Sequence, residues 1–177
     1  VYCEDADGVK FLVEMQNWSQ QYFNKRAIYY STFAIQDQAA KEKRHQLKTL
    51  GKDKWDYNFA PVYLVCFLTF NMKRSLPNLT KVKEDDYISI YKYTDVETNE
   101  LLGDGTTLIF IEMKKFCKSL KECSSEKERW ICSLKSMGEQ LEMPQELSGT
   151  ILQTMYDKAA LAALPLEKRI SYISKAV

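Results

Sequence analysis

Apolar and polar positions along the first sixteen residues predict a β-hairpin. Residues 1–5 and 9–16 are rich in Val, Phe, Leu and Tyr, and the intervening residues 6–8, Ala-Asp-Gly, are a turn signal. A two-residue loop would mix polar and apolar side chains on both faces. A three-residue loop, with the glycine in the left-handed conformation, would place Cys3 opposite Phe11 and gather the apolar residues on one face. We expect the second register, because a slip of one residue exchanges every side chain between core and solvent.

The other face of this hairpin is polar. Glu14 and Gln16 are two residues apart on one strand and therefore share a face. In the three-residue-loop register, the residue immediately before Val1 would lie directly opposite Glu14. Glu4 lies opposite Lys10, and we expect these two to form a surface ion pair. A strand face that is polar only because water touches it would show the same pattern.

Helical spacing predicts a long helix over about residues 20–45, with Asn17 or Ser19 as its cap. The side chains expected to face the sheet recur along this segment: Phe23, Ala27, Tyr30 and Ala34. The helix ends in a basic stretch.

A continuous apolar run over residues 61–70 predicts a strand covered on both faces, reached from the hairpin by a right-handed crossover. Residues 87–95 and 107–116 predict a further hairpin. The last third is expected to be helical, over 125–137, from Pro144 to about 163, and from Pro165 onward.

The fold class that follows is α/β, with a mixed central sheet flanked by helices and a helical C-terminal extension. We expect residues 1–120 to form the core and residues 121–177 to form a helical extension of the same domain.

Composition narrows the functional classes. The chain has 177 residues, of which 45% are hydrophobic and 28% charged, and its net charge of +1 creates no global field for nucleic acid. Five cysteines without a CxxC pair and a single histidine argue against a zinc cage and favour reduced, cytoplasmic thiols. The longest apolar run is too short to span a bilayer and no signal peptide is present, so we expect no membrane association. Because the chain starts at Val inside a strand, we interpret it as a fragment that lacks its N-terminus.

Glu14 and Gln16 are also candidates for binding a metal ion and for orienting water or phosphate. Two acidic oxygens and a backbone carbonyl suit Mg²⁺, which prefers hard oxygen ligands and keeps several waters. Such an ion can polarise a phosphoryl oxygen and lower the pKa of a bound water that attacks it. Gln16 cannot act as a base, but its amide can orient the attacking water or hold a phosphate oxygen.

Several segments together resemble a known family. The chain reads FLVEMQNW at residues 11–18, RAIYYS at 26–31 and PVYLVCFL at 61–68, followed by IEMKKF at 111–116, ERWICSLK at 128–135 and LPLEKRISYISKA at 164–176. In their order and spacing these segments resemble the bacterial PD-(D/E)XK nuclease family transposases, which are related to the recombination-promoting nucleases. The resemblance covers nearly the whole chain and implies a restriction-endonuclease-like fold.

The resemblance also implies an activity. Glu14 matches the metal-binding acid, Gln16 matches the position that most of the superfamily fills with Lys, and the first Asp falls immediately before Val1. The implied function is an Mg²⁺-dependent (or Mn²⁺-dependent) DNA endonuclease, a transposase-like phosphodiester hydrolase, with Glu14 and Gln16 as its catalytic residues. This fragment would lack one metal ligand and be inactive by itself. The alternative is a catalytically inactive nuclease-like module that binds DNA or a protein partner.

Candidate DNA-binding residues follow on the long helix. In this superfamily the helix after the active strand borders the site, which selects Arg26 and Gln36, although Arg26 could equally have a surface role. The basic helix end could meet a phosphate backbone through Lys41, Arg44 and Lys48. A solvated helix end with cations near its negative pole would look the same. A homodimer is compatible with the function, since cutting both strands of DNA needs two sites.

Overall fold

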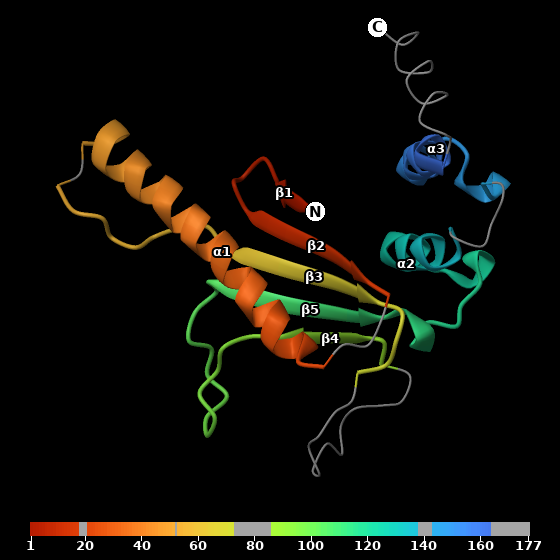
Figure 1. Cartoon of the computed structure of the whole chain (residues 1–177), viewed down its shortest axis with the longest axis horizontal. Coiled ribbons are helices and arrows are strands. Elements are labelled where there is room, and N and C mark those ends of the chain that lie inside the picture. Colours follow the sequence, from red (N-terminus) through yellow and green to blue (C-terminus); the bar gives the residue numbers. More distant parts are fainter. Residues whose placement is uncertain (18–20, 52, 73–85, 138–142, 164–177) are drawn as a thin grey trace, which may run out of the picture. The chain divides into compact units, whose positions relative to one another are not determined.

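The computed structural model describes residues 1–17, 21–51, 53–72, 86–137 and 143–163 (Figure 1). The chain forms two compact units, which comprise residues 1–116 and the residues from Cys117 onward. We describe each unit by itself. The expected division at residue 120 into a core and an extension of the same domain stays a prediction.

The first unit is built on a mixed five-stranded sheet of order β1-β2-β3-β5-β4 (Figure 1). The three central strands β2, β3 and β5 are parallel, and the edge strands β1 and β4 are antiparallel to their neighbours. The bounds of the strands are β1 Tyr2–Glu4, β2 Lys10–Gln16, β3 Val62–Leu68, β4 Ile88–Tyr91 and β5 Thr106–Glu112. The expected α/β class with a mixed central sheet is confirmed.

The N-terminal hairpin adopts the register expected from the sequence. Cys3 lies opposite Phe11, and Gly8 has a φ of +80°. The backbone N–H of Asp5 donates to the carbonyl of Val9 at 3.1 Å, so these two residues close a three-residue loop. The carboxylate of Asp5 accepts a hydrogen bond from the Val9 N–H at 2.9 Å, which holds the turn in place.

Helix α1 (Phe23–Arg44) crosses one face of the sheet (Figure 1). Phe23 and Ala27 pack there against Leu64, Cys66 and other side chains of a buried apolar cluster. The helix continues as one π-helical turn, His45–Thr49.

The start of α1 differs from the expectation. The helix begins at Phe23, and its N-cap is Tyr22, which has a left-handed backbone (φ 65°) and makes no side-chain capping hydrogen bond. The expected cap at Asn17 is therefore wrong, and Ser19 lies outside the described residues. Among the side chains expected to face the sheet, Tyr30 is only partly buried.

The face of β2 that carries Glu14 is the face covered by α1, not a solvent face. Lys10 and Gln16 are 1% and 8% exposed, whereas Met15 on the opposite face is 44% exposed. The reason is Leu12, which shares a face with Glu14 and packs against the buried cluster beneath α1. The pair of Lys10 with Glu4 is present, but its lysine is buried rather than on the surface.

The second hairpin is shorter than expected, because β4 and β5 stop at Tyr91 and Glu112. A loop that contains an isolated bridge between Thr94 and Leu101 joins these two strands. The carboxylate of Asp95 accepts hydrogen bonds from backbone N–H groups in this loop, which hold the pKa of Asp95 below its usual value.

The second unit is helical. Helix α2 (Glu126–Ser136) begins after Ser125, whose hydroxyl accepts from the Glu128 N–H, and helix α3 is Ile151–Ala163. Pro144 does not start the last described helix as expected. It precedes one 3₁₀ turn, and Gly149, which has a left-handed backbone (φ +75°), separates this turn from α3. The helix expected from Pro165 lies outside the described residues. Within the part of the chain that is described, no helix has both the length and the apolar character needed to span a bilayer.

Candidate nuclease site

The carboxyl ends of the three parallel strands meet at one edge of the sheet. Glu14 on β2 lies beside Cys66 on β3, and Cys66 lies beside Phe110 on β5. Two residues further along, Gln16 lies beside Leu68. In open α/β sheets this edge is where ligands commonly bind.

Helix α1 brings a cation to the same place. Nη2 of Arg26 donates to Oε1 of Gln16 at 2.6 Å and lies 3.5 Å from Oε1 of Glu14. The guanidinium also lies over the rings of Phe23 and Tyr30, at 5.5 Å and 5.8 Å from their centroids. Arg26 thus joins the two candidate catalytic side chains, and two aromatic rings support it.

The contact with Arg26 fixes the orientation of the Gln16 amide. A guanidinium has only donors, so the amide atom that faces it at 2.6 Å must be the oxygen. The NH₂ group of Gln16 therefore points to the other side of the amide.

Glu14 is partly shielded from solvent, with 24% of its side chain exposed. Its charge reaches the neighbouring thiol of Cys66. Burial first, and then the negative charge of Glu14, raise the pKa of the Cys66 thiol to about 12, against the smaller opposing effect of Arg26. Cys66 is therefore a neutral packing group and not a nucleophile.

A hollow of about 420 Å³ opens beside Glu14 at the β1 side of β2. Its lining is formed by Val1, Tyr2, Leu12, Val13, Glu14, Met15, Tyr30 and Leu64. The N–H of Val13 donates to the carbonyl of Val1 at 2.7 Å, so these two residues lie opposite each other. A side chain one position before Val1 would therefore be directed to the Glu14 side of the sheet.

The described residues supply only part of a divalent-cation site. In the described ranges, no three His, Cys, Asp or Glu side chains come together in a group that could hold a metal ion. Asp5 and Asp7 lie at the hairpin turn, at the opposite end of β2 from Glu14. Glu14 fits the role of one carboxylate ligand, and a complete site needs at least one further ligand.

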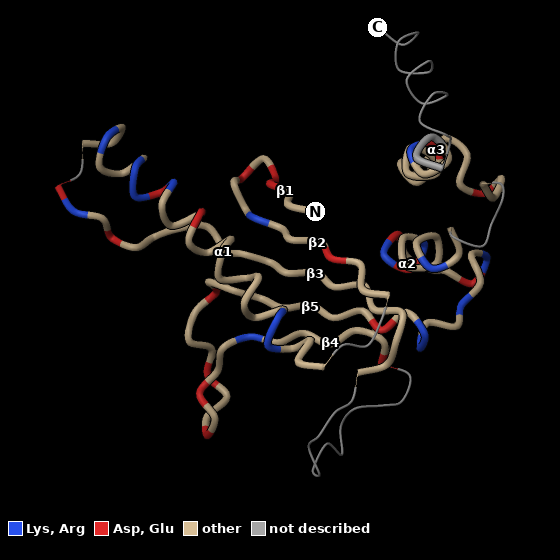
Figure 2. The backbone as a smooth tube through the Cα atoms, in the orientation of Figure 1, with Lys and Arg blue, Asp and Glu red and all other residues tan. Residues whose placement is uncertain are grey.

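The remaining DNA-binding candidates do not join this site. They lie toward or beyond the C-terminal end of α1, and the residues concerned are Gln36, Lys41, Arg44 and Lys48, all exposed. Arg44 is 18 residues after Arg26, roughly 27 Å along a helix. Lys41 pairs with Asp37 at 3.0 Å, and this lysine and the Tyr2 hydroxyl together hold the pKa of Asp37 below its usual value. Figure 2 shows the Lys and Arg positions at this end of the helix.

Sequence reasoning did not single out Glu112, the residue beside Leu68 on β5. Its carboxylate is fully buried and accepts from the Met72 N–H at 2.7 Å and from the Lys115 ammonium at 3.0 Å. The signal was available, since a Glu at the carboxyl end of a parallel strand shares an edge with Gln16. The contacts show an acid that fixes the chain after β3 to the end of β5.

The comparison with protein families decides the identity. The family model of the PD-(D/E)XK nuclease family transposases matches residues 1–176. The chain belongs to this family. No curated protein and no solved structure matches the chain. The five-stranded mixed sheet with α1 across one face is consistent with the restriction-endonuclease-like fold of PD-(D/E)XK proteins, and membership in a transposase nuclease family implies DNA as the partner.

Proposed function

We propose that this PD-(D/E)XK family member is a DNA endonuclease that depends on a divalent cation, Mg²⁺ or Mn²⁺, with Glu14 as a metal ligand and Gln16 as a catalytic residue. The observation that carries the proposal is the meeting of Glu14, Gln16 and Arg26 at the carboxyl edge of the parallel strands. When bound, the cation would polarise the phosphate and activate a water molecule. The other ligand is expected from the residue that precedes Val1, which would face Glu14.

Gln16 has a narrower role here than its sequence position alone suggests. Its amide oxygen accepts from Arg26, so its NH₂ group is the part directed away from the guanidinium. An NH₂ group donates hydrogen bonds, and the oxygens of a phosphodiester only accept them. Gln16 would therefore act as a donor, to a phosphate oxygen or to the oxygen of the attacking water, and not as an acceptor.

Arg26 supplies the positive charge that a lysine two residues after Glu14 would supply in most of the superfamily. Its side chain is 26% exposed, and Nη2 lies 3.5 Å from Glu14 and 2.6 Å from Gln16, so an incoming phosphate would meet the guanidinium beside both side chains. Arginine is suited to this because its planar fork matches phosphate oxygens and stays charged. Gln36, Lys41, Arg44 and Lys48 would at most contact DNA at a distance from the cut.

The alternative is a nuclease-like module that binds DNA or a protein without cutting. The observation that favours it is the ion pair itself, since the guanidinium of Arg26 lies 3.5 Å from the carboxylate that a metal ion would need. A neighbouring cation weakens the binding of a metal ion to that carboxylate. In this case Glu14 and Arg26 would stabilise each other and contribute no chemistry.

The test is nicking of supercoiled plasmid by the protein with its upstream sequence present, in Mg²⁺ and in Mn²⁺. Glu14→Gln is expected to lower the rate at least about 100-fold, because a metal ion contributes several kcal/mol and each 1.36 kcal/mol is a factor of ten. Gln16→Glu keeps an acceptor for Arg26 but loses the donor, and should also lower the rate. Glu100→Gln, in the exposed loop between β4 and β5, is the matched control and should leave the rate unchanged.

Two outcomes would contradict the proposal. Nicking that survives Glu14→Gln at the wild-type rate would remove the role of Glu14. A wild-type protein that shifts the fluorescence anisotropy of labelled DNA but never cuts it, in either metal, would establish the binding module instead.

A further inference from the structure

In the sheet formed by the described residues, strand β4 lies at an edge and has an unusual sequence. Residues 86–92 read Asp-Tyr-Ile-Ser-Ile-Tyr-Lys, which is a palindrome around Ser89 except that its ends carry opposite charges. Among the described residues, only β5 pairs with β4. The strand contains no proline and no charge between Tyr87 and Tyr91, and Ile90 and Tyr91 are 62% and 43% exposed. Natural proteins normally blunt such an edge with charges, proline or a bulge.

From this pattern we propose that β4 pairs antiparallel with β4 of a second copy of the chain, around a two-fold axis at Ser89. In this register Asp86 lies opposite Lys92 of the second copy, Tyr87 opposite Tyr91, and Ile88 opposite Ile90. The same segment of both copies forms the interface, and each of these residue pairs occurs twice, as a two-fold axis requires. Cross-strand aromatic, aliphatic and opposite-charge pairs of this kind each stabilise a sheet.

The backbone supports the same register. The N–H of Glu112 donates to the carbonyl of Tyr87 at 2.7 Å, and these residues are opposite each other in the extension of the β4–β5 ladder. Hydrogen-bonded residues alternate along an antiparallel strand, so Ile88 and Ile90 direct their backbone groups away from β5. A two-fold axis at Ser89 pairs Ile88 with Ile90. The outward groups of one copy therefore meet the outward groups of the other.

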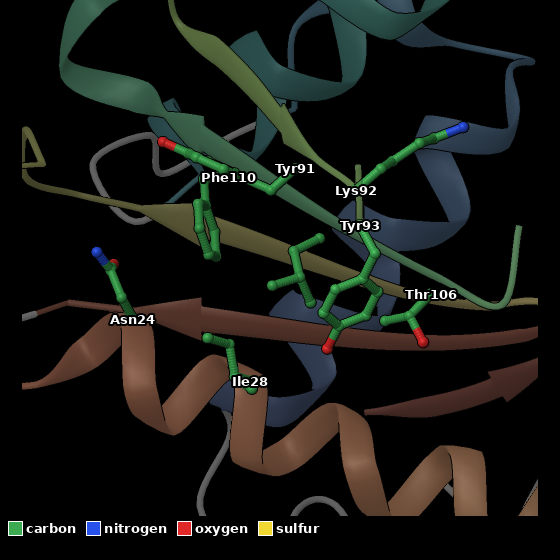
Figure 3. A pocket seen from close by; sticks show the side chains of 8 residues that line it. Asn24, Ile28, Tyr91, Lys92, Tyr93, Thr106 and Phe110 are labelled. Carbon is green, nitrogen blue, oxygen red and sulfur yellow. The ribbon is translucent and has the colours of Figure 1, made fainter. Parts of the chain in front are cut away.

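The side chains are divided between the two faces in a way that suits the pairing. Tyr91 lies beside Leu108 and, with Tyr93 and Ile28, lines a groove of about 280 Å³ between β4 and α1. Lys92, one residue beyond the end of β4, also belongs to the lining of this groove, but its ammonium extends away from the groove interior (Figure 3). Lys92 thus shares the opposite face with Ile88 and Ile90, where it would meet Asp86 of the second copy.

The assembly would also set the distance between two sites. Glu14, Cys66, Phe110 and Ser89 lie in one row across the sheet. With the axis at Ser89, the two copies of Glu14 lie on one line, on one face, seven strand spacings apart, or roughly 34 Å before sheet twist is considered. This is close to one turn of B-DNA. The link to DNA rests on the proposed function, whereas the pairing of β4 does not.

The first test exchanges the charges at the ends of β4 and measures the mass of the chain by sedimentation equilibrium. Asp86→Lys alone and Lys92→Asp alone each place like charges opposite each other at both ends. Each is expected to raise the dissociation constant of the dimer about tenfold. The double variant Asp86→Lys/Lys92→Asp restores opposite charges and should restore the dimer. A double variant that is as weak as the single variants would overturn the register.

The second test is a disulfide across the axis, in a background where Cys3 and Cys117, both exposed, are serine. The two copies of Ser89 would form a non-hydrogen-bonded pair with Cα atoms about 4.5 Å apart, within disulfide range. Ser89→Cys should therefore cross-link on mild oxidation. Ile90→Cys is the control, because its two copies would be roughly 8 Å apart, beyond that range.

The outcomes are independent of nuclease activity. A chain that stays monomeric at its highest soluble concentration would overturn the proposal. This holds even if β4 then pairs with a strand of another protein. Cross-linking of Ile90→Cys as fast as Ser89→Cys would also overturn it. Failure of plasmid nicking, in contrast, bears only on the proposed function.

Discussion

The contact between Arg26 and Gln16 can be measured as a coupling free energy without any substrate. Arg26→Met removes the guanidinium and keeps an apolar stem over Phe23 and Tyr30. Gln16→Met removes the amide and keeps a similar length. The two single variants and the double variant form a double-mutant cycle, from which the interaction of the two side chains is obtained as the deviation from additivity.

The structure sets the expected size of this coupling. Hydrogen bonds to a charged group contribute about 1.5–3 kcal/mol, and the short contact lies next to an amide that is 8% exposed. Because the Arg26 side chain is 26% exposed, solvent screens part of this. We expect a coupling of about 1–2 kcal/mol. For a chain of this length each kcal/mol corresponds to a Tm change of roughly 2–4 °C.

The assay is urea unfolding followed by circular dichroism, with the free energy of unfolding extrapolated to water for all four proteins. A second cycle, Arg26→Met with Lys41→Met, is the control, since 15 helical residues separate these side chains by roughly 22 Å and distant sites are additive within about 0.5 kcal/mol. A coupling between Arg26 and Gln16 no larger than in the control cycle would refute the geometry on which the orientation of the Gln16 amide rests.

Two further predictions concern ionisable groups. Because burial raises the pKa of Cys66 to about 12, iodoacetamide at pH 8 should alkylate the exposed Cys117 and leave Cys66 unmodified until the chain unfolds. Mass spectrometry of the digested peptides measures the labelling, and early labelling of Cys66 would contradict its burial. The ion pair with Lys118 lowers the pKa of Glu128 from 4.5 to about 2, so its contribution to stability is complete above pH 4.5 and is lost as pH falls toward 2. The stability difference between wild type and Glu128→Gln should accordingly be constant from pH 5 to 7 and shrink below pH 4.5, and a difference that grows on acidification would have the wrong sign.

Local pattern was sufficient to locate the strands, although not the ends of the second hairpin, and to fix the register of the first hairpin. The glycine at position 8 permits the left-handed turn residue that a three-residue loop requires, so the pairing of Cys3 with Phe11 follows from composition and turn chemistry alone. The apolar run around Leu64 likewise predicted a strand in the centre of the sheet. It is apolar on both faces, as expected of the central strand in a parallel arrangement.

The covered face of β2 could not be derived in the same way. A period of two separates the side chains of a strand into two sets, but it does not say which set a helix will cover. The set with Lys10 and Glu14 looked like the solvent side, yet Leu12 belongs to it and joins the cluster under α1. The start of α1 was missed for a related reason. Its first residue, Phe23, is determined by packing against Phe70 and Phe110 on the sheet, and not by a capping side chain.

The covered face in turn accounts for the glutamine at position 16. A lysine there would place an ammonium next to the Arg26 guanidinium at a position that is only 8% exposed, where like charges repel strongly and solvent screens little. Glutamine avoids this repulsion and gives the guanidinium an acceptor. Under the proposed function, Gln16 and Arg26 would act as one unit, in which the positive charge of the site would come from the helix and not from the strand, and the neutral amide would keep a donor directed away from it. On this argument the substitution of lysine by glutamine is not by itself a sign of a degenerate nuclease, because the cation is still present 3.5 Å from Glu14.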